Sequence, residues 1–213
     1  NLEFKKIDER KLHLKKISYA IKCDEELIDQ KKTIKYFNNE LKKNILFSNH
    51  VKEIQKIGKK FVIKNNKYDY VINCTWQQSF ALKKLNLIYE NCMIPIYKSN
   101  LKEHPAYTIM DGPFFTFYPW KKNVFGLYSV KYSRLNKSKN INYIKSKFQN
   151  TKYINKIKIK KKIETRFSEF YPDFKKNFKF CGFLTSIRTI LSNKNDARIC
   201  IVENNNNFIN ILS

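Results

Sequence analysis

Arg188 is the residue whose surroundings most directly suggest chemistry. It ends the apolar run Phe183-Leu184-Thr185-Ser186-Ile187-Arg188, where a charge is costly unless it is paired. A guanidinium in such a strand can hold a carboxylate or another anion through two parallel hydrogen bonds. The alternative is a structural salt bridge to Asp196 or Glu203. Arg198 lies in a similar strand, and both arginines are therefore candidates for binding a substrate.

The other reactive residue types form no catalytic set. No Ser-His-Asp arrangement or pair of carboxylates stands out, so we expect no catalytic acid–base residue. The histidines are scattered in polar surroundings: His13, His50 and His104. The five cysteines contain no C-x-x-C pair, which argues against a zinc site or a disulfide scaffold and predicts buried thiols in a reducing cytoplasm. They are Cys23, Cys74, Cys92, Cys181 and Cys200.

Glycine is too sparse for a phosphate-binding loop. The chain has four glycines, and no two lie close together: Gly58, Gly112, Gly126 and Gly182. Neither G-x-x-x-x-G-K-[ST] nor G-x-G-x-x-G can be formed from them, although both loops need glycine where the backbone approaches phosphate. These 213 residues therefore carry no glycine-rich phosphate cradle.

The formal net charge is +25 and the isoelectric point is about 9.8, which suggests a polyanionic partner. However, 38 of the 43 basic residues are lysine, whereas arginine is favoured for bidentate phosphate contacts. Lysine, asparagine and isoleucine also share A/T-rich codons. Residues 137–162 hold ten lysines and no acid. A solvated basic helix face is the favoured interpretation, and binding of RNA or an anionic surface is the alternative.

The length allows one domain or two small ones, and no apolar run is long enough to span a bilayer. A helix is predicted from about 30 to 43, with Asp29 as its N-cap and Asn44 as a left-handed stop. Its apolar face holds Ile34, Phe37 and Leu41.

Strands surround that helix in the first 86 residues. They are predicted over 17–23, 45–47, 51–57, 61–64 and 68–76, and a short helix is predicted over 77–86. The run at 70–74 does not alternate, which is typical of a strand covered on both faces.

Longer β-type runs separated by polar turns follow from residue 87 and predict an antiparallel sheet. Residues 140–170 favour helix, although 157–160 fits a strand equally well. The predicted strands are 87–98, 107–111, 114–118, 124–132, 180–190, 197–203 and 208–212.

Three stretches together resemble the middle of an FAD-dependent oxidoreductase of the D-amino-acid-oxidase/glycine-oxidase (DAO) superfamily. Glu26-Leu27-Ile28-Asp29 is similar to the family's G-x-[IV]-D entry into a helix. Residues 69–75, D-Y-V-I-N-C-T, resemble its A-D-x-V-[IV]-N-[AC]-[TA]-G strand beneath the cofactor. The third stretch is Asp111-Gly112-Pro113-Phe114 with the later strands that bear Arg188 and Asp196-Ala197-Arg198.

The resemblance implies cofactor contacts in the first part of the chain. Val51 matches a position whose backbone pairs with the adenine edge. Cys74 and Thr75 match small residues against the nucleotide, although core packing would explain them equally well. Trp76 replaces the usual glycine, and its ring could stack near FAD.

Aromatic residues could line a substrate pocket, with core packing as the alternative. Phe114 and Tyr118 are the residues we expect at the substrate, and the same alternatives apply to Phe115, Phe117 and Trp120.

The resemblance implies an α+β fold with a partial FAD-binding domain at 1–86, an antiparallel substrate domain at 87–185 and return strands at 186–213. Its activity would be transfer of a hydride from an amine, an amino acid or a related small polar substrate to FAD. We expect a small-molecule substrate and neither a metal nor a membrane partner. Because the family's glycine-rich phosphate contacts lie outside these 213 residues, we expect the chain alone to bind FAD weakly and to be inactive.

Overall fold

Strands dominate the structure, a computed structural model that describes residues 4–8, 10, 12–24, 26–75, 86–101, 106–110, 112, 114–192 and 200–212. The helices are α1 (Gln30–Glu40), α2 (Ile141–Asn150), α3 (Tyr153–Phe167) and α4 (Phe174–Asn177). The strands before residue 86 are β1 (Phe4–Ile7), β2 (Ala20–Cys23), β3 (Gln55–Ile57), β4 (Lys60–Ile63), β5 (Asn66–Tyr68) and β6 (Val71–Asn73). Those after it are β7 (Leu87–Lys98), β8 (Tyr107–Ile109), β9 (Phe115–Lys121), β10 (Val124–Ser129), β11 (Arg134–Ser138), β12 (Lys179–Leu191), β13 (Ile201–Asn205) and β14 (Phe208–Leu212).

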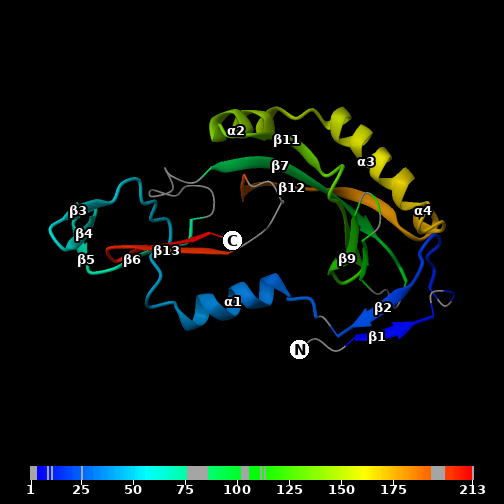
Figure 1. The fold of residues 1–213 in the computed structure, drawn as a ribbon, viewed down its shortest axis with the longest axis horizontal. Coiled ribbons are helices and arrows are strands. Elements are labelled where there is room, and N and C mark those ends of the chain that lie inside the picture. Colours follow the sequence, from blue (N-terminus) through cyan, green and yellow to red (C-terminus); the bar gives the residue numbers. More distant parts are fainter. Residues whose placement is uncertain are drawn as a thin grey trace.

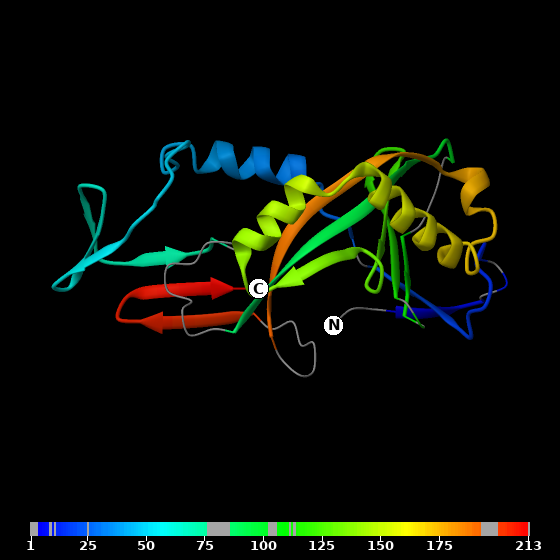
Figure 2. The ribbon, with the colours of Figure 1, turned by 90° about the horizontal axis from the view of Figure 1, so that it is seen from above.

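A six-stranded antiparallel sheet forms the larger part of the molecule, and β7 is its central strand. β12 pairs with β7 along its whole length on one side. On the other side, β11 pairs with the first half of β7 and β10 pairs with its end, followed by β9 and β8. The long β7 and β12 curve side by side through the molecule (Figures 1 and 2). This arrangement confirms the predicted antiparallel sheet.

Helices α2, α3 and α4 lie along one face of this sheet (Figure 1). The core between the two layers is mainly aromatic. Phe117 is fully buried and its ring lies 4.8 Å from that of Phe178 and 5.6 Å from that of Phe174. The hydroxyl of Tyr97 on β7 donates to the Glu164 carboxylate of α3, which also pairs with Lys160 at 2.8 Å. This buried network attaches α3 to the sheet.

Two of the three smaller sheets lie at the end of the molecule away from α4, whereas the antiparallel pair β1–β2 lies at the α4 end (Figure 1). β3, β4 and β5 form an antiparallel meander. After the six-stranded sheet the chain returns through the β13–β14 hairpin, and β14 pairs in parallel with β6. The rings of Phe61 and Phe208 meet edge to face at 5.7 Å and connect the meander to β14. Residues more than 130 positions apart thereby share one sheet.

Several local predictions are confirmed and others are wrong. Asp29 caps α1 by accepting from the backbone N–H groups of Lys31 and Lys32. The helix ends at Glu40, and Asn44 does not adopt the left-handed conformation. No strand forms over 45–47, and the strand predicted from residue 51 begins only at Gln55.

Packing decides one ambiguous segment of the second half, and the strand predicted over 114–118 extends further than expected. Residues 157–160 are helical, because Ile159, Ile163 and Phe167 follow a four-residue spacing and face the core. β9 continues through Pro119, where the pairing with β10 shifts register, a position at which a strand tolerates proline. The predicted helix at 77–86 lies outside the described residues, except for residue 86.

The apolar face predicted for α1 exists but is not covered. Ile34, Phe37 and Leu41 are 59%, 53% and 45% exposed, and no residue of α1 is buried. The cysteines also differ from the prediction: all five are free thiols, and only Cys92 is buried. Within the described ranges, no helix has the length and apolar character needed to cross a membrane.

Candidate functional site

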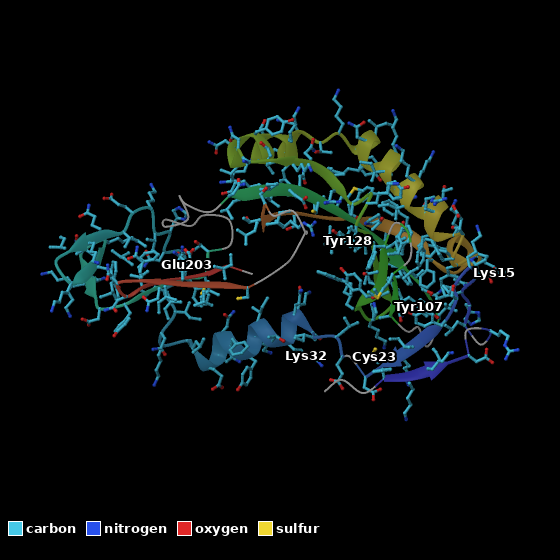
Figure 3. All side chains as sticks on the ribbon, in the orientation of Figure 1. Lys15, Cys23, Lys32, Tyr107, Tyr128 and Glu203 are labelled. Carbon is cyan, nitrogen blue, oxygen red and sulfur yellow. The ribbon has the colours of Figure 1, made fainter. Side chains whose placement is uncertain are left out.

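Arg188 lies on β12 directly opposite Glu90 of β7. Its Nε donates to Glu90 Oε2 at 2.7 Å, and its Nη2 lies 2.6 Å from the same oxygen in an ion pair. The carboxylate is 1% exposed and the guanidinium side chain is 17% exposed. Arg188 therefore forms an ion pair, but its partner is neither of the two acids that the sequence suggested, and its role in binding a substrate stays a prediction. Glu203 is exposed on β13 (Figure 3), and Asp196 lies outside the described residues.

A second guanidinium approaches the same carboxylate. Arg134, at the start of β11, places Nη1 3.5 Å from Glu90 Oε1 and donates from Nε to the Val130 carbonyl. Burial acts to lower the pKa of the Arg188 guanidinium, but the neighbouring Cys92, Glu90 and Tyr128 outweigh it and raise that pKa. Two cations thus share one anion, which leaves this cluster, Arg188–Glu90–Arg134, with one net positive charge.

Tyr118 and Tyr128 extend this cluster across the sheet. Tyr118 on β9 faces Gly126 on β10, and a Cβ on Gly126 would lie 3.1 Å from the Tyr118 ring and 3.3 Å from Ile94. Glycine at position 126 therefore leaves the space that the Tyr118 ring occupies. Burial, and secondarily Tyr128, raises the pKa of Tyr118.

These side chains occupy the sheet face opposite the helices. Alternation along β9 and β10 places Tyr118 and Tyr128 on one face, while Phe117 and Phe125 lie in the core beneath α3 and α4. Tyr128 is seen on the side of the sheet away from α2 and α3 (Figure 3). We call this surface the open face. Its mixture of guanidinium, carboxylate and phenol groups suits a small anionic or polar ligand.

The structure separates the aromatic candidates for the substrate site. Tyr118 lies on the open face, and the Trp120 ring is 6.3 Å from it. Phe115 and Phe117 are fully buried, so the core interpretation is correct for these two. Phe114 precedes β9, is 36% exposed and has a positive φ of 49°, with its carbonyl accepting from Val130. Arg198 lies outside the described residues.

The proposed cofactor contacts lie on a different sheet, around β6. Val71 and Asn73 are buried, but Ile72 is 61% exposed. The expectation of a strand covered on both faces is therefore wrong for β6, since only one of its faces is packed. Cys74 and Thr75 follow the strand and are exposed.

A buried asparagine pair joins β6 to β14, and the sequence analysis missed it. Asn73 Nδ2 donates to Asn210 Oδ1 at 3.0 Å, and Asn73 Oδ1 accepts from the backbone N–H and the hydroxyl of Thr75. Both asparagines end an apolar-Ile-Asn tripeptide, Val71-Ile72-Asn73 and Phe208-Ile209-Asn210, and that repetition is the signal that could have revealed them. They lie at the carboxyl end of a parallel strand pair, the edge at which α/β sheets bind ligands.

The remaining predicted contacts are not brought together. Val51 is half-buried in a segment before β3 that forms no strand. Trp76 lies outside the described residues. No cluster of three or more potential metal ligands occurs in the described part of the chain.

Comparison with known proteins gives one informative match. Over 203 residues the chain is 24% identical to the FAD-dependent monooxygenase FPY4 of Fusarium mangiferae. The alignment covers 95% of this chain and 54% of FPY4, so the chain spans about half the length of that relative. No family model matches the sequence, and no solved structure matches it.

Proposed function

We propose that this chain is part of an FAD-dependent oxidoreductase, with the six-stranded sheet on the substrate side and the β6–β14 sheet on the cofactor side. The observation that carries the proposal is the alignment with FPY4, which runs through both sheets. The strand pairing is consistent with this proposal. The chain leaves β6, forms the six-stranded sheet and comes back as β14, which pairs in parallel with β6. Both sheets could therefore contribute residues to one site.

The residues around β6 suit part of such a cofactor. The Asn73–Asn210 pair fixes the carboxyl end of the two parallel strands, and Thr75 is held there by its hydrogen bonds to Asn73. Cys74 and Thr75 offer small, exposed side chains beside which a nucleotide could lie. The phosphate contacts must come from elsewhere, since the sequence has no glycine-rich loop. FAD would supply the two-electron acceptor.

On the open face, we assign Arg188 and Arg134 to the binding of an anionic group of the substrate. Glu90 occupies Arg188 Nε and Nη2, while Nη1 donates to no described residue. Because the cluster keeps one net positive charge, a carboxylate brought to it would gain a charge-assisted hydrogen bond. Tyr118, with Phe114 just before the start of β9, would bound the substrate on the β9 side. A DAO-like oxidation of an amine or amino acid fits this arrangement.

FAD content is the first test. The polypeptide expressed from the complete gene should release FAD when it is denatured, identified by mass spectrometry of the supernatant. Replacing Thr75 by bulky Trp should reduce the FAD content, while Thr165→Trp, at an exposed position of α3 on the opposite layer, should not. Purified, folded protein that contains no FAD and binds none when it is added would overturn the proposal.

The reaction type needs a second test, because hydride transfer from substrate and oxygen insertion differ in their source of electrons. An amine or amino-acid oxidase reduces its flavin with substrate alone under anaerobic conditions. A monooxygenase, as FPY4 is named, would instead need a separate reductant. We expect bleaching of the flavin by an anionic substrate without a nicotinamide, and we expect Arg188→Lys to raise KM sharply. Arg166→Lys, on α3 at the opposite layer, is the matched control.

A further inference from the structure

The outer surface of α2 and α3 is strongly basic and lies on the opposite side of the sheet from the open face (Figure 1). Seven of the ten lysines at 137–162 are exposed: Lys137, Lys139, Lys147, Lys152, Lys158, Lys161 and Lys162. We call these seven residues and their surroundings the α2–α3 surface. The helices form because their apolar residues, including Ile144 and Ile163, pack on the sheet, which leaves the lysines pointing outward.

Little on this surface neutralises the charge. Lys160 pairs with the buried Glu164, and Arg166 pairs with Glu169. None of the seven exposed lysines forms an ion pair with a residue that the structure describes. Ordinary solvated helices alternate the two signs of charge, whereas here a single sign extends over two consecutive helices. The surface therefore presents a positive field to any anionic partner.

Exposed apolar side chains lie within the basic surface. Ile154, at the start of α3, is 58% exposed, whereas the ring of the neighbouring Tyr153 packs edge to face on Phe183 of β12 at 5.9 Å. Tyr143 on α2 is 46% exposed, and the Lys147 ammonium lies 5.5 Å from its ring centroid. Lysines on a helical face combined with apolar and aromatic residues are the combination that binds lipid headgroups and inserts into the acyl boundary.

We propose that the α2–α3 surface docks on a membrane that contains anionic lipid. Each exposed lysine near such a surface strengthens binding, and Ile154 can bury its side chain among acyl chains. The docked orientation leaves the open face free on the other side of the sheet. The proposal revises the expectation of no membrane partner and does not depend on the proposed oxidoreductase function.

The composition of the surface favours lipid over RNA. Arg166, its arginine, is already paired with Glu169, although guanidinium groups are preferred for phosphate and base contacts. Tyr143 offers one ring on which a base could stack, but Ile154 offers none and is suited to the acyl layer instead. A lysine-rich surface with an exposed isoleucine therefore matches a headgroup layer better.

Vesicle sedimentation tests the proposal. The protein should sediment with vesicles of phosphatidylcholine mixed with phosphatidylserine, should not sediment with phosphatidylcholine alone, and should be released by salt. The variant Lys158→Glu/Lys161→Glu/Lys162→Glu should bind at least about tenfold more weakly. Its control, Lys31→Glu/Lys32→Glu/Lys35→Glu on α1, changes the net charge equally and should keep most of the binding. Figure 3 shows Lys32 of this control on α1, on the far side of the sheet from α2 and α3.

A single apolar change completes the test. Ile154→Ser should weaken vesicle binding several-fold without changing its dependence on salt, since it removes insertion and leaves the charge intact. Circular dichroism would verify that each variant is folded. Equal loss in the two triple variants would show that net charge alone is responsible and would overturn the proposal. Absence of binding to the anionic vesicles, or tighter binding to single-stranded RNA at the same salt concentration, would overturn it as well.

Discussion

Two regions of the molecule differ in how far they bury their apolar residues. One is the six-stranded sheet with helices α2, α3 and α4, and the other consists of the remaining segments of the chain. Among the buried hydrophobic side chains of the described residues, only Phe61 and Val71 lie outside residues 86–192. Most of the large hydrophobic residues that are exposed lie in the other segments, including the apolar face of α1. The sheet region therefore has its own core, while the outer segments depend on short sheets and local hydrogen bonds. Stability is concentrated where apolar surface is removed from water.

The largest expected difference between the two regions comes from matched phenylalanine substitutions. Phe117→Ala should lower the free energy of unfolding by about 3–5 kcal/mol, because it empties a fully buried position among aromatic rings. Phe37→Ala on α1, 53% exposed, should change it by less than about 0.5 kcal/mol. Urea unfolding followed by circular dichroism measures both. A similar loss in the two variants would show that the regions share one core.

Two ion pairs provide the second comparison. Glu90→Gln leaves Arg188 and Arg134 without their buried counter-charge and should cost about 3 kcal/mol. Asp69 and Lys60 pair on the exposed meander, so Asp69→Asn should cost less than about 1 kcal/mol. Thermal unfolding at neutral pH would separate the two. If Asp69→Asn proves the more damaging change, the meander is more important to the fold than its exposure suggests.

Two buried asparagines should respond in opposite directions. Asn91 on β7 is 1% exposed, and its amide nitrogen and oxygen form no hydrogen bond with the described residues. Asn91→Leu should therefore stabilise the protein by up to about 1 kcal/mol. Asn73→Leu, which removes the bonds to Asn210 and Thr75, should destabilise it by about 1–3 kcal/mol. Destabilisation by Asn91→Leu would indicate that this amide binds a partner, such as a buried water.

The smallest effect is a change in the alkaline stability of the sheet region. Burial, and then the Glu164 carboxylate, raises the pKa of Tyr97 far above its ordinary value of 10.0. The folded state thus holds the phenol proton more tightly than the unfolded chain. Its contribution to stability is complete below pH 10.0 and is lost as the pH rises further. Tyr97→Phe should flatten the decline of stability above that pH in urea titrations, and an unchanged slope would contradict the assignment.

Local patterns predicted the elements that depend on local contacts. The strand over 87–98 has the predicted bounds, and the Asp29 cap and the antiparallel sheet are confirmed. The hydrophobic pattern did not predict the correct structure at 45–47, where the segment is too short to show a period. It did not decide the structure at 157–160, where the pattern fits a helix and a strand equally well. At 157–160, the core that Ile163 and Phe167 fill determined the helix.

The candidate site was predictable only in part, because side-chain partners depend on strand register. The sequence identified Arg188 as a charge that needs a partner, but it offered acids close in sequence, whereas the actual partner lies 98 positions away. Tyr118 shares a face with Arg188 because β9, β10, β7 and β12 pair in that order. No local pattern contains that order.

The positive charge of residues 137–162, the lack of a glycine-rich loop and the positions of the long strands follow from the amino-acid sequence alone. These features depend on composition or on residues within a few positions of one another. In contrast, the folded arrangement places Glu90 between two guanidinium groups and brings Asn73 to Asn210, 137 positions away. Contacts of this kind arise when strands distant in sequence align, and their register is set by burial across the whole sheet.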